Sequence, residues 1–380
     1  MNKHIVSVFC FALSLMVPPV VAAVAPVPAP PTLAANSYIL TDFNSGRILA
    51  AKDIDKKFEP ASITKIMTAY VVYKEIEAGR LQMQDQVTIS KKAWQTGGSK
   101  MFVEVGKQVA VEDLLKGLVI QSGNDATIAL AEHVGGSEEV FASLMNQYAY
   151  KLGMKNTNFV NSTGLPDPKH VSTARDIATL ARATIAEFPG HYKLYAEHEY
   201  TWNNITQPNR NLLLYRDNTV DGIKTGHTES AGYCLVSSAV RDNMRLISVV
   251  LGTRSDTARA DISQALLGYG YRFYESDQMY AAGKDLNQAR VWKGSAENLT
   301  LGLQDDLHVT VPRGQYKNLD TVMEINQEIE APVQKGQPLG MVRIMLEGKE
   351  IVSRPLVALQ PVAEGNIWQR TRDHVIRWFE

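Results

Sequence analysis

The stretch EPASITKIMTAYVVY, residues 59–73, places a serine and a lysine one helical turn apart in an otherwise apolar segment. Pro60 and Ala61 precede Ser62 at the expected start of a helix, where the positive end of the helix dipole would face the serine hydroxyl. Lys65 follows three residues later, so its amine can reach the Ser62 oxygen. A serine hydroxyl needs a base to act as a nucleophile, and a lysine can serve only when burial or nearby positive charge lowers its pKa. The apolar neighbours supply such a setting, so the spacing predicts a nucleophile and its base.

An SxxK pattern alone is weak evidence, because it arises by chance about once in a chain of this length. Two further short motifs follow it in the chain. Ser122-Gly123-Asn124 lies between two predicted helices, and Lys224-Thr225-Gly226 lies on a predicted strand. Three motifs in this order, on a helix, a loop and a strand, reduce the odds of coincidence to roughly a few per cent.

With these motifs the chain resembles the penicillin-recognising serine acyl transferases, whose signature is SxxK, SDN or a variant of it, and KTG. SGN stands here in place of SDN. The resemblance is closer to the low-molecular-mass penicillin-binding proteins that act as serine-type D-alanyl-D-alanine carboxypeptidases. It covers nearly all of the mature chain, in segments that include SYILTDFNSGRILA, EPASITKIMT, QSGNDA, the NRN near 210, VDGIKTGHT and RFYE.

The resemblance implies an α/β (α+β) catalytic domain of the β-lactamase/transpeptidase type, with a central antiparallel sheet flanked by helices, and a small all-β C-terminal domain. The composition changes near Asp277, where helical patterns give way to short strands and turns such as DLHVTVPRGQ. We therefore expect a catalytic domain at 36–276 and a β-rich domain at 277–365.

The resemblance also implies the roles of the residues that carry the chemistry. Ser62 would be the nucleophile that forms an acyl-enzyme, and Lys65 the base that takes its proton. Ser122 would relay a proton to the amine of the leaving D-alanine. Asn124 would hold both Lys65 and the substrate amide.

The opposite wall of the cleft would bind the terminal carboxylate of the substrate through Lys224 and Thr225. Gly226 would leave the strand open so that substrate can lie alongside it, and the backbone amides of Ser62 and His227 would form an oxyanion hole. The arginines that the family places near the carboxylate correspond to Arg210 and Arg259.

The first 23 residues have the pattern of a signal peptide. Lys3 precedes an apolar run, 5–16, that is too short to span a bilayer, and two prolines and a small-residue cleavage site follow. Cleavage after Ala23 would leave a Pro/Ala tether, 24–35, and only one cysteine, Cys234. That cysteine lies in a strand-like run and is predicted to be a buried hydrophobic residue rather than a reactive thiol.

The C-terminal stretch NIWQRTRDHVIRWFE, 366–380, is amphipathic at helical spacing. Two tryptophans and a phenylalanine beside three arginines favour a helix lying in a membrane interface, although a helix docked on its own domain would have a similar pattern. We therefore expect an exported protein on the periplasmic face of a bacterial inner membrane. The apolar face consists of Ile367, Trp368, Thr371, Val375, Trp378 and Phe379.

Composition limits the partners. The formal net charge is −1, and Lys and Arg are scattered without a basic stripe, so nucleic acid is not expected. No HExxH or comparable ligand set appears, so neither a metal nor another cofactor is expected. The expected partners are the D-Ala-D-Ala end of a peptidoglycan stem peptide, β-lactam antibiotics and a membrane surface.

Rival functions remain on the same scaffold. A class A β-lactamase needs a carboxylate within an ExxxN loop, and the one formal match, EYTWN at 199–203, has the pattern of a strand. A penicillin sensor would belong on a receptor with transmembrane and signalling segments, which do not appear. Transpeptidase or endopeptidase activity stays open, because cleft shape rather than a motif selects the acceptor.

Overall fold

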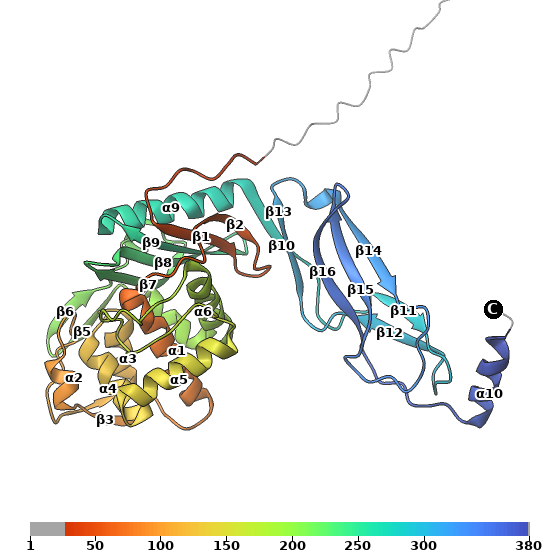
Figure 1. Ribbon diagram of the computed structural model, residues 1–380, viewed down its shortest axis with the longest axis horizontal. Coiled ribbons are helices and arrows are strands. Elements are labelled where there is room, and N and C mark those ends of the chain that lie inside the picture. Colours follow the sequence, from red (N-terminus) through yellow and green to blue (C-terminus); the bar gives the residue numbers. More distant parts are fainter. Residues whose placement is uncertain (1–26, 379–380) are drawn as a thin grey trace, which may run out of the picture.

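The computed structural model describes residues 27–378. The predicted signal peptide, the first residues of the tether (24–26), and Phe379 and Glu380 lie outside the described residues. The chain forms a mixed helix and sheet domain followed by a β domain, and a short helix lies at the far end of the β domain (Figure 1). The predicted fold class is confirmed.

A five-stranded antiparallel sheet in the order β2-β1-β9-β8-β7 forms the centre of the first domain. Alternate side chains point to opposite faces, as strand geometry dictates. Leu40 and Leu246 pack with helix α9, Asp256–Phe273, whereas Ile39 and Ile247 pack among the other helices. The strands are β1 Ser37–Asp42, β2 Ile48–Lys52, β7 Val220–Thr228, β8 Gly232–Arg241 and β9 Met244–Thr253.

The remaining helices of this domain lie on the face opposite α9 (Figure 1), except the short α8, whose Leu213 and Leu214 pack in the same cluster as α9. The helix that was expected at Ser62 begins as a 3-10 turn, η1 Ala61–Thr64, and continues as α1 Lys65–Glu77. The others are α2 Lys91–Gln95, α3 Val111–Val119, α4 Asn124–Gly135, α5 Glu138–Lys151, α6 Ala174–Glu187, α7 Pro189–Tyr192, η2 Lys193–Ala196 and α8 Leu213–Arg216. Two short hairpins pair β3 Gln86–Thr88 with β4 Gln108–Ala110, and β5 Glu199–Trp202 with β6 Ile205–Pro208.

Cys234 lies on β8 and is buried, as predicted. Burial raises the pKa of its thiol to about 11, because the thiolate is poorly solvated there. The thiol is therefore protonated at neutral pH and packs as a small apolar side chain.

The second domain consists of antiparallel strands around two apolar clusters. Strand β10 runs through the predicted domain boundary at Asp277 and pairs along its length with β13. The strands are β10 Tyr274–Tyr280, β11 Asn287–Arg290, β12 Asn298–Gly302, β13 Leu307–Pro312, β14 Leu319–Ile325, β15 Pro338–Leu346 and β16 Lys349–Ala358, with a 3-10 turn η3 at Tyr316–Asn318.

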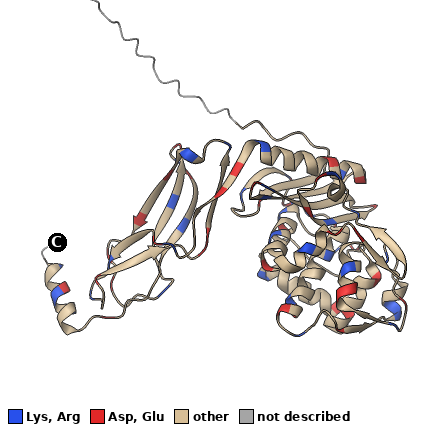
Figure 2. Cartoon of the chain, turned by 180° about the vertical axis from the view of Figure 1, so that it is seen from behind, with Lys and Arg blue, Asp and Glu red and all other residues tan. Residues whose placement is uncertain are grey.

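The final helix, α10 Ile367–Ile376, begins with a capping box in which Asn366 and Gln369 bond reciprocally to each other's backbone amides. No helix within residues 27–378 is long and apolar enough to cross a membrane. Lys and Arg residues are interspersed with Asp and Glu residues along both domains (Figure 2).

Candidate active site

A cleft of about 740 Å³ lies where the η1 turn, the loop 161–165 and strand β7 meet. Two predicted site residues, Lys65 and Lys224, are buried behind its wall. The other eight line it: Ser62, Ser122, Asn124, Arg210, Thr225, Gly226, His227 and Arg259. The fold thus brings together side chains from five separate parts of the sequence.

Lys65 is fully buried and its amine contacts the serine one turn away. Its Nζ donates to Ser62 Oγ at 3.0 Å, to Asn124 Oδ1 at 2.7 Å and to the Thr163 carbonyl at 2.9 Å. Burial and, secondarily, the nearby charge of Arg210 lower the pKa of Lys65 to about 7, although the charge of Asp125 opposes the shift.

The consequence is a lysine that exchanges its proton near neutral pH. A neutral amine keeps two N–H bonds and gains a lone pair. If the N–H bonds stay on the Asn124 oxygen and the Thr163 carbonyl, the lone pair faces Ser62 Oγ. That is the arrangement a general base requires, with the accepting atom within hydrogen-bond reach of the proton it takes.

The SGN motif connects α3 to α4 and supplies the facing wall. Ser122 has a left-handed backbone, with φ of 61°, and lines the cleft. The Asn124 side chain is fixed from behind, because its Nδ2 donates to the Gly97 carbonyl at 2.7 Å. This bond turns the amide oxygen toward Lys65. A Cβ at Gly98 would lie 2.7 Å from that Nδ2, so the close approach needs a glycine.

The KTG motif lies on β7, directly beside the catalytic turn. A Cβ at Gly226 would come within 3.0 Å of the Pro60 carbonyl, so glycine allows the strand to approach η1. This contact adds a packing reason to the predicted role of Gly226 in leaving room for substrate. Burial lowers the pKa of Lys224 well below its usual value, and the charges of Lys65 and the two site arginines lower it further.

The two arginines differ in their surroundings. Arg210 is exposed and lines the cleft between β6 and α8. Arg259 is buried on α9, donates to the Gly226 carbonyl at 3.1 Å, and lies over the Tyr233 ring. Arg259 therefore braces the back of β7, while Arg210 is open to an incoming anion. The His227 ring packs on Tyr233, with ring centroids 4.0 Å apart.

Several contributors to the site carry no signal in the sequence motifs. The Thr163 and Gly97 carbonyls accept from Lys65 and Asn124 through the main chain, which any residue possesses. Asp125 accepts bonds from three consecutive backbone amides of the rim at 101–103. Its position directly after SGN is the one clue that could have found it.

Fold and site together define a class: serine acyl-transfer enzymes in which a lysine serves as the base, with a cationic pocket for an anionic end of the substrate. The chain belongs to the D-alanyl-D-alanine carboxypeptidase family, peptidase S11, whose family model matches residues 24–255. A second model, the C-terminal domain of penicillin-binding protein 5, matches residues 274–364. The predicted family is confirmed.

Curated relatives and solved structures cover nearly the whole chain. D-alanyl-D-alanine carboxypeptidase DacC of Escherichia coli is 45% identical over 379 residues, 97% of this chain and 94% of that protein. DacA of the same organism is 44% identical over 358 residues, 92% of this chain and 89% of that protein. Penicillin-binding protein 5 of Haemophilus influenzae has 42% sequence identity and a TM-score of 0.86, covering 88% of this chain and 99% of that chain.

Proposed function

We propose that the chain is a serine-type DD-carboxypeptidase that removes the terminal D-alanine from peptidoglycan stem pentapeptides through an acyl-enzyme on Ser62. One observation carries the assignment of roles: the amine of a fully buried lysine, whose pKa is about 7, lies 3.0 Å from the Ser62 hydroxyl. The confirmed family supplies the reaction and the substrate class.

In the first step the terminal carboxylate binds at Lys224 and Thr225, with Arg210 at the open side of the pocket. Lys65 takes the proton of Ser62, and Oγ attacks the carbonyl carbon of the penultimate D-alanine. The backbone amides of Ser62 and His227 stabilise the resulting oxyanion. Ser122 gives its hydroxyl proton to the amine as the peptide bond breaks and regains one from the protonated Lys65, so free D-alanine leaves and Lys65 is neutral again.

In the second step a water molecule replaces the departed D-alanine. Lys65 takes a proton from the water, whose oxygen attacks the ester carbonyl, and the proton returns to Ser62 Oγ as the ester bond breaks. The products are a tetrapeptide and the free enzyme. The same base thus serves both steps, which suits a group whose pKa lies near the working pH.

A β-lactam would follow the first step only, since its leaving group stays attached and hinders the water. Within residues 27–378, Asp256 is the one carboxylate that lines the cleft, and it lies at the start of α9. The Glu199 side chain of the rival EYTWN motif is exposed on β5, a strand as predicted. These features support slow release of the penicilloyl adduct and argue against β-lactamase activity.

Product analysis tests the reaction. Purified protein given a stem pentapeptide should release tetrapeptide and free D-alanine in equal amounts, and the Ser62→Ala variant should release neither. Mass spectrometry distinguishes the alternatives: a cross-linked dimer would favour a transpeptidase, and cleavage of supplied cross-linked peptide without D-alanine release would favour an endopeptidase.

We further propose that α10 lies in the interface of the inner membrane, on its periplasmic face. The polar side of the helix holds the β domain: Asp373 is buried and accepts from the Lys293 amide at 2.6 Å, and Arg377 pairs with Glu328 at 3.0 Å. The opposite side is bare, since Ile367 is 78% and Trp368 83% exposed. A helix docked for packing alone would bury those side chains.

The position of α10 supports the same proposal. It lies at the end of the molecule farthest from the catalytic domain (Figures 1 and 2). An interfacial helix there would hold the protein on the membrane and leave the cleft free to meet peptidoglycan.

A further inference from the structure

The loop 161–165 connects the catalytic lysine to a cluster that lies outside the cleft. The Thr163 carbonyl accepts from Lys65 Nζ at 2.9 Å, and the Ser162 carbonyl accepts from Thr68 Oγ1, one turn farther along α1, at 2.6 Å. Two consecutive carbonyls of the loop thus face the helix that carries the base. The position of the Thr163 carbonyl decides where one N–H of Lys65 points.

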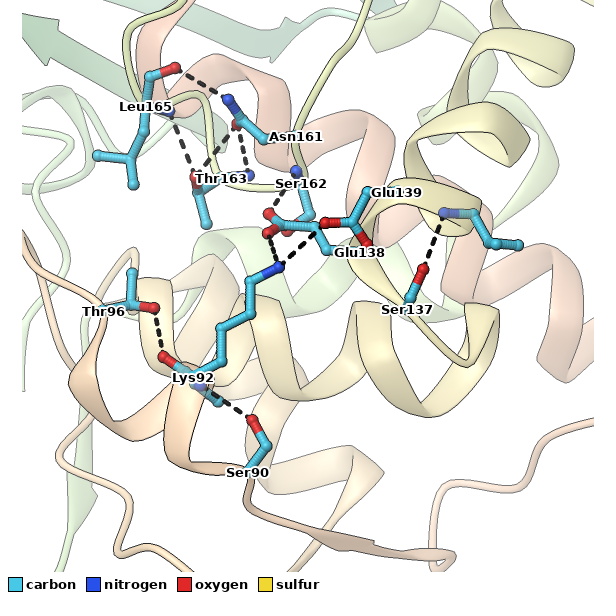
Figure 3. Close-up of polar contacts among 12 residues, drawn as sticks. Ser90, Lys92, Thr96, Ser137, Glu138, Glu139, Asn161, Ser162, Thr163 and Leu165 are labelled. Carbon is cyan, nitrogen blue, oxygen red and sulfur yellow. Dashed lines mark hydrogen bonds and ion pairs between the residues drawn. The ribbon is translucent and has the colours of Figure 1, made fainter.

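Glu138, the first residue of α5, holds this loop from the other side (Figure 3). Its buried carboxylate accepts from the Ser162 amide at 3.0 Å and from Ser162 Oγ at 2.8 Å. Its second oxygen pairs with Lys92 Nζ at 2.9 Å. Neither Glu138 nor Ser162 lines the cleft, so neither side chain is placed to touch substrate.

The loop is confined elsewhere as well. Asn161 Oδ1 accepts from the Thr163 and Gly164 amides, which closes a tight turn. At Gly164 a Cβ would overlap the Ala61 carbonyl, at 1.8 Å, so the loop already touches the turn that carries Ser62. The loop cannot move farther toward that turn, and Glu138 prevents it from moving away.

We propose that Glu138 is a positioning residue for the base: through Ser162 it holds the Thr163 carbonyl against Lys65, so that the lone pair of the neutral amine faces Ser62. This inference rests on the proposed role of Lys65. Glu138 acts on Lys65 through hydrogen bonds rather than through its charge, since the charges that shift the pKa of Lys65 are those of Arg210 and Asp125.

The inference predicts a specific kinetic change. Without Glu138 the loop relaxes, and the neutral lysine loses the acceptor that directs its lone pair, so kcat and the acylation rate fall while KM stays nearly constant. The ammonium form also loses an acceptor. A hydrogen bond to the charged form raises the pKa of a lysine, so removing it lowers that pKa. The acidic limb of the acylation profile should therefore move to lower pH.

The experiment compares Glu138→Ala and Ser162→Ala with Glu139→Ala in the full-length protein. Glu139 is the matched control: it lies in the same first turn of α5 and contacts the same Lys92, but its side chain is 76% exposed and makes no bond to the loop. The readouts are penicillin acylation rate against pH, kcat and KM on pentapeptide, and Tm. We expect Glu138→Ala to slow acylation by about 10- to 100-fold at pH 7, the scale of a small misplacement of a catalytic group.

Ser162→Ala, which keeps the backbone donor, should slow acylation less, and Glu139→Ala should match wild type. An unchanged rate in a folded Glu138→Ala protein, an equal loss in Glu139→Ala, or a loss with an unmoved acidic limb would overturn the inference.

Glu138→Gln decides the matter if Glu138→Ala does not fold. The glutamine oxygen still accepts from Ser162 while the charge facing Lys92 is lost, so the inference expects a nearly normal rate and an unmoved acidic limb. A strong loss in Glu138→Gln beside a normal Ser162→Ala would overturn it. Failure of wild type to acylate Ser62 would instead contradict the proposed function, because normal wild-type acylation is the baseline for every comparison.

Discussion

The catalytic cleft and helix α10 differ in whether their positively charged side chains are paired with carboxylates. Four basic side chains gather at the cleft: Arg210 and Arg259 line it, and Lys65 and Lys224 are buried behind its wall. None of them makes an ion pair with a carboxylate in the part of the chain that the structure describes. At α10, Arg372 pairs with Glu297 at 2.7 Å, and Arg377 pairs with Glu328 and Glu330. The positive charge at the cleft is therefore available to an anionic ligand, whereas the arginines of α10 form ion pairs that attach this helix to the β domain.

The two regions also differ in how their charges affect stability. Burying a charge without a partner is unfavourable, and the two lysines of the cleft respond with lowered pKa values. Exposed ion pairs such as those of α10 contribute only about 0 to 1 kcal/mol each. The buried lysines beside the cleft thus reduce the stability of the catalytic domain, whereas α10 is held to the β domain by several weak contacts and one buried carboxylate, Asp373.

The largest effect should come from replacing the base. Lys65→Arg keeps the positive charge, but arginine stays protonated at working pH and cannot take the Ser62 proton. Acylation by penicillin should fall about 10²- to 10⁴-fold, the usual contribution of general base catalysis. A thermal melt checks that the variant is folded. A nearly normal acylation rate in a folded Lys65→Arg protein would show that Lys65 is not the general base.

A smaller loss should follow removal of the charge that binds the carboxylate. Lys224→Ala should cost about 2 to 4 kcal/mol of transition-state stabilisation, roughly 30- to 1000-fold in kcat/KM. Wild type should process a substrate amidated at its terminal carboxylate poorly, and Lys224→Ala should discriminate less between the two substrates. An unchanged preference for the free carboxylate would transfer the role to Arg210 or Arg259.

The pH profile should show the mutual repulsion of the cations. Acylation should increase as pH rises through about 7, because Lys65 becomes neutral above its pKa. Arg210 lowers that pKa, so Arg210→Gln should raise it and move the acidic limb to higher pH, with a loss of several-fold at pH 6. Arg182→Gln, on α6 and outside the cleft, is the control. An acidic limb that does not move in Arg210→Gln would show that Arg210 does not influence the pKa of Lys65.

The smallest effect on activity should come from changes in and beside α10. Trp368→Ser with Trp378→Ser removes exposed aromatic rings, so the protein should lose binding to anionic lipid vesicles while peptidase activity on soluble substrate is unchanged. Co-sedimentation with vesicles measures the membrane binding, and D-alanine release measures the peptidase activity. Variants that still bind would contradict the interfacial role of α10. Tyr150→Ser, at an exposed tyrosine of the catalytic domain, is the control.

Particular residues show which parts of the fold and of the site could be predicted from the sequence. The motifs at 62–65, 122–124 and 224–226 predicted the cleft, because side-chain chemistry at fixed spacing is visible in a sequence. The anchoring of Lys65 by the Thr163 carbonyl was not predictable, because every residue has such a carbonyl. The tail pattern indicated an amphipathic helix but could not tell which face meets the protein, and the structure docks the polar one.

The most direct test of the central claim, a Ser62 nucleophile served by Lys65, is intact-protein mass spectrometry during reaction with penicillin. We expect one covalent penicillin per chain, mapped to a peptide that contains Ser62, absent in Ser62→Ala, and released over minutes or longer. An adduct on another residue, or rapid penicillin hydrolysis by an unlabelled protein, would contradict it.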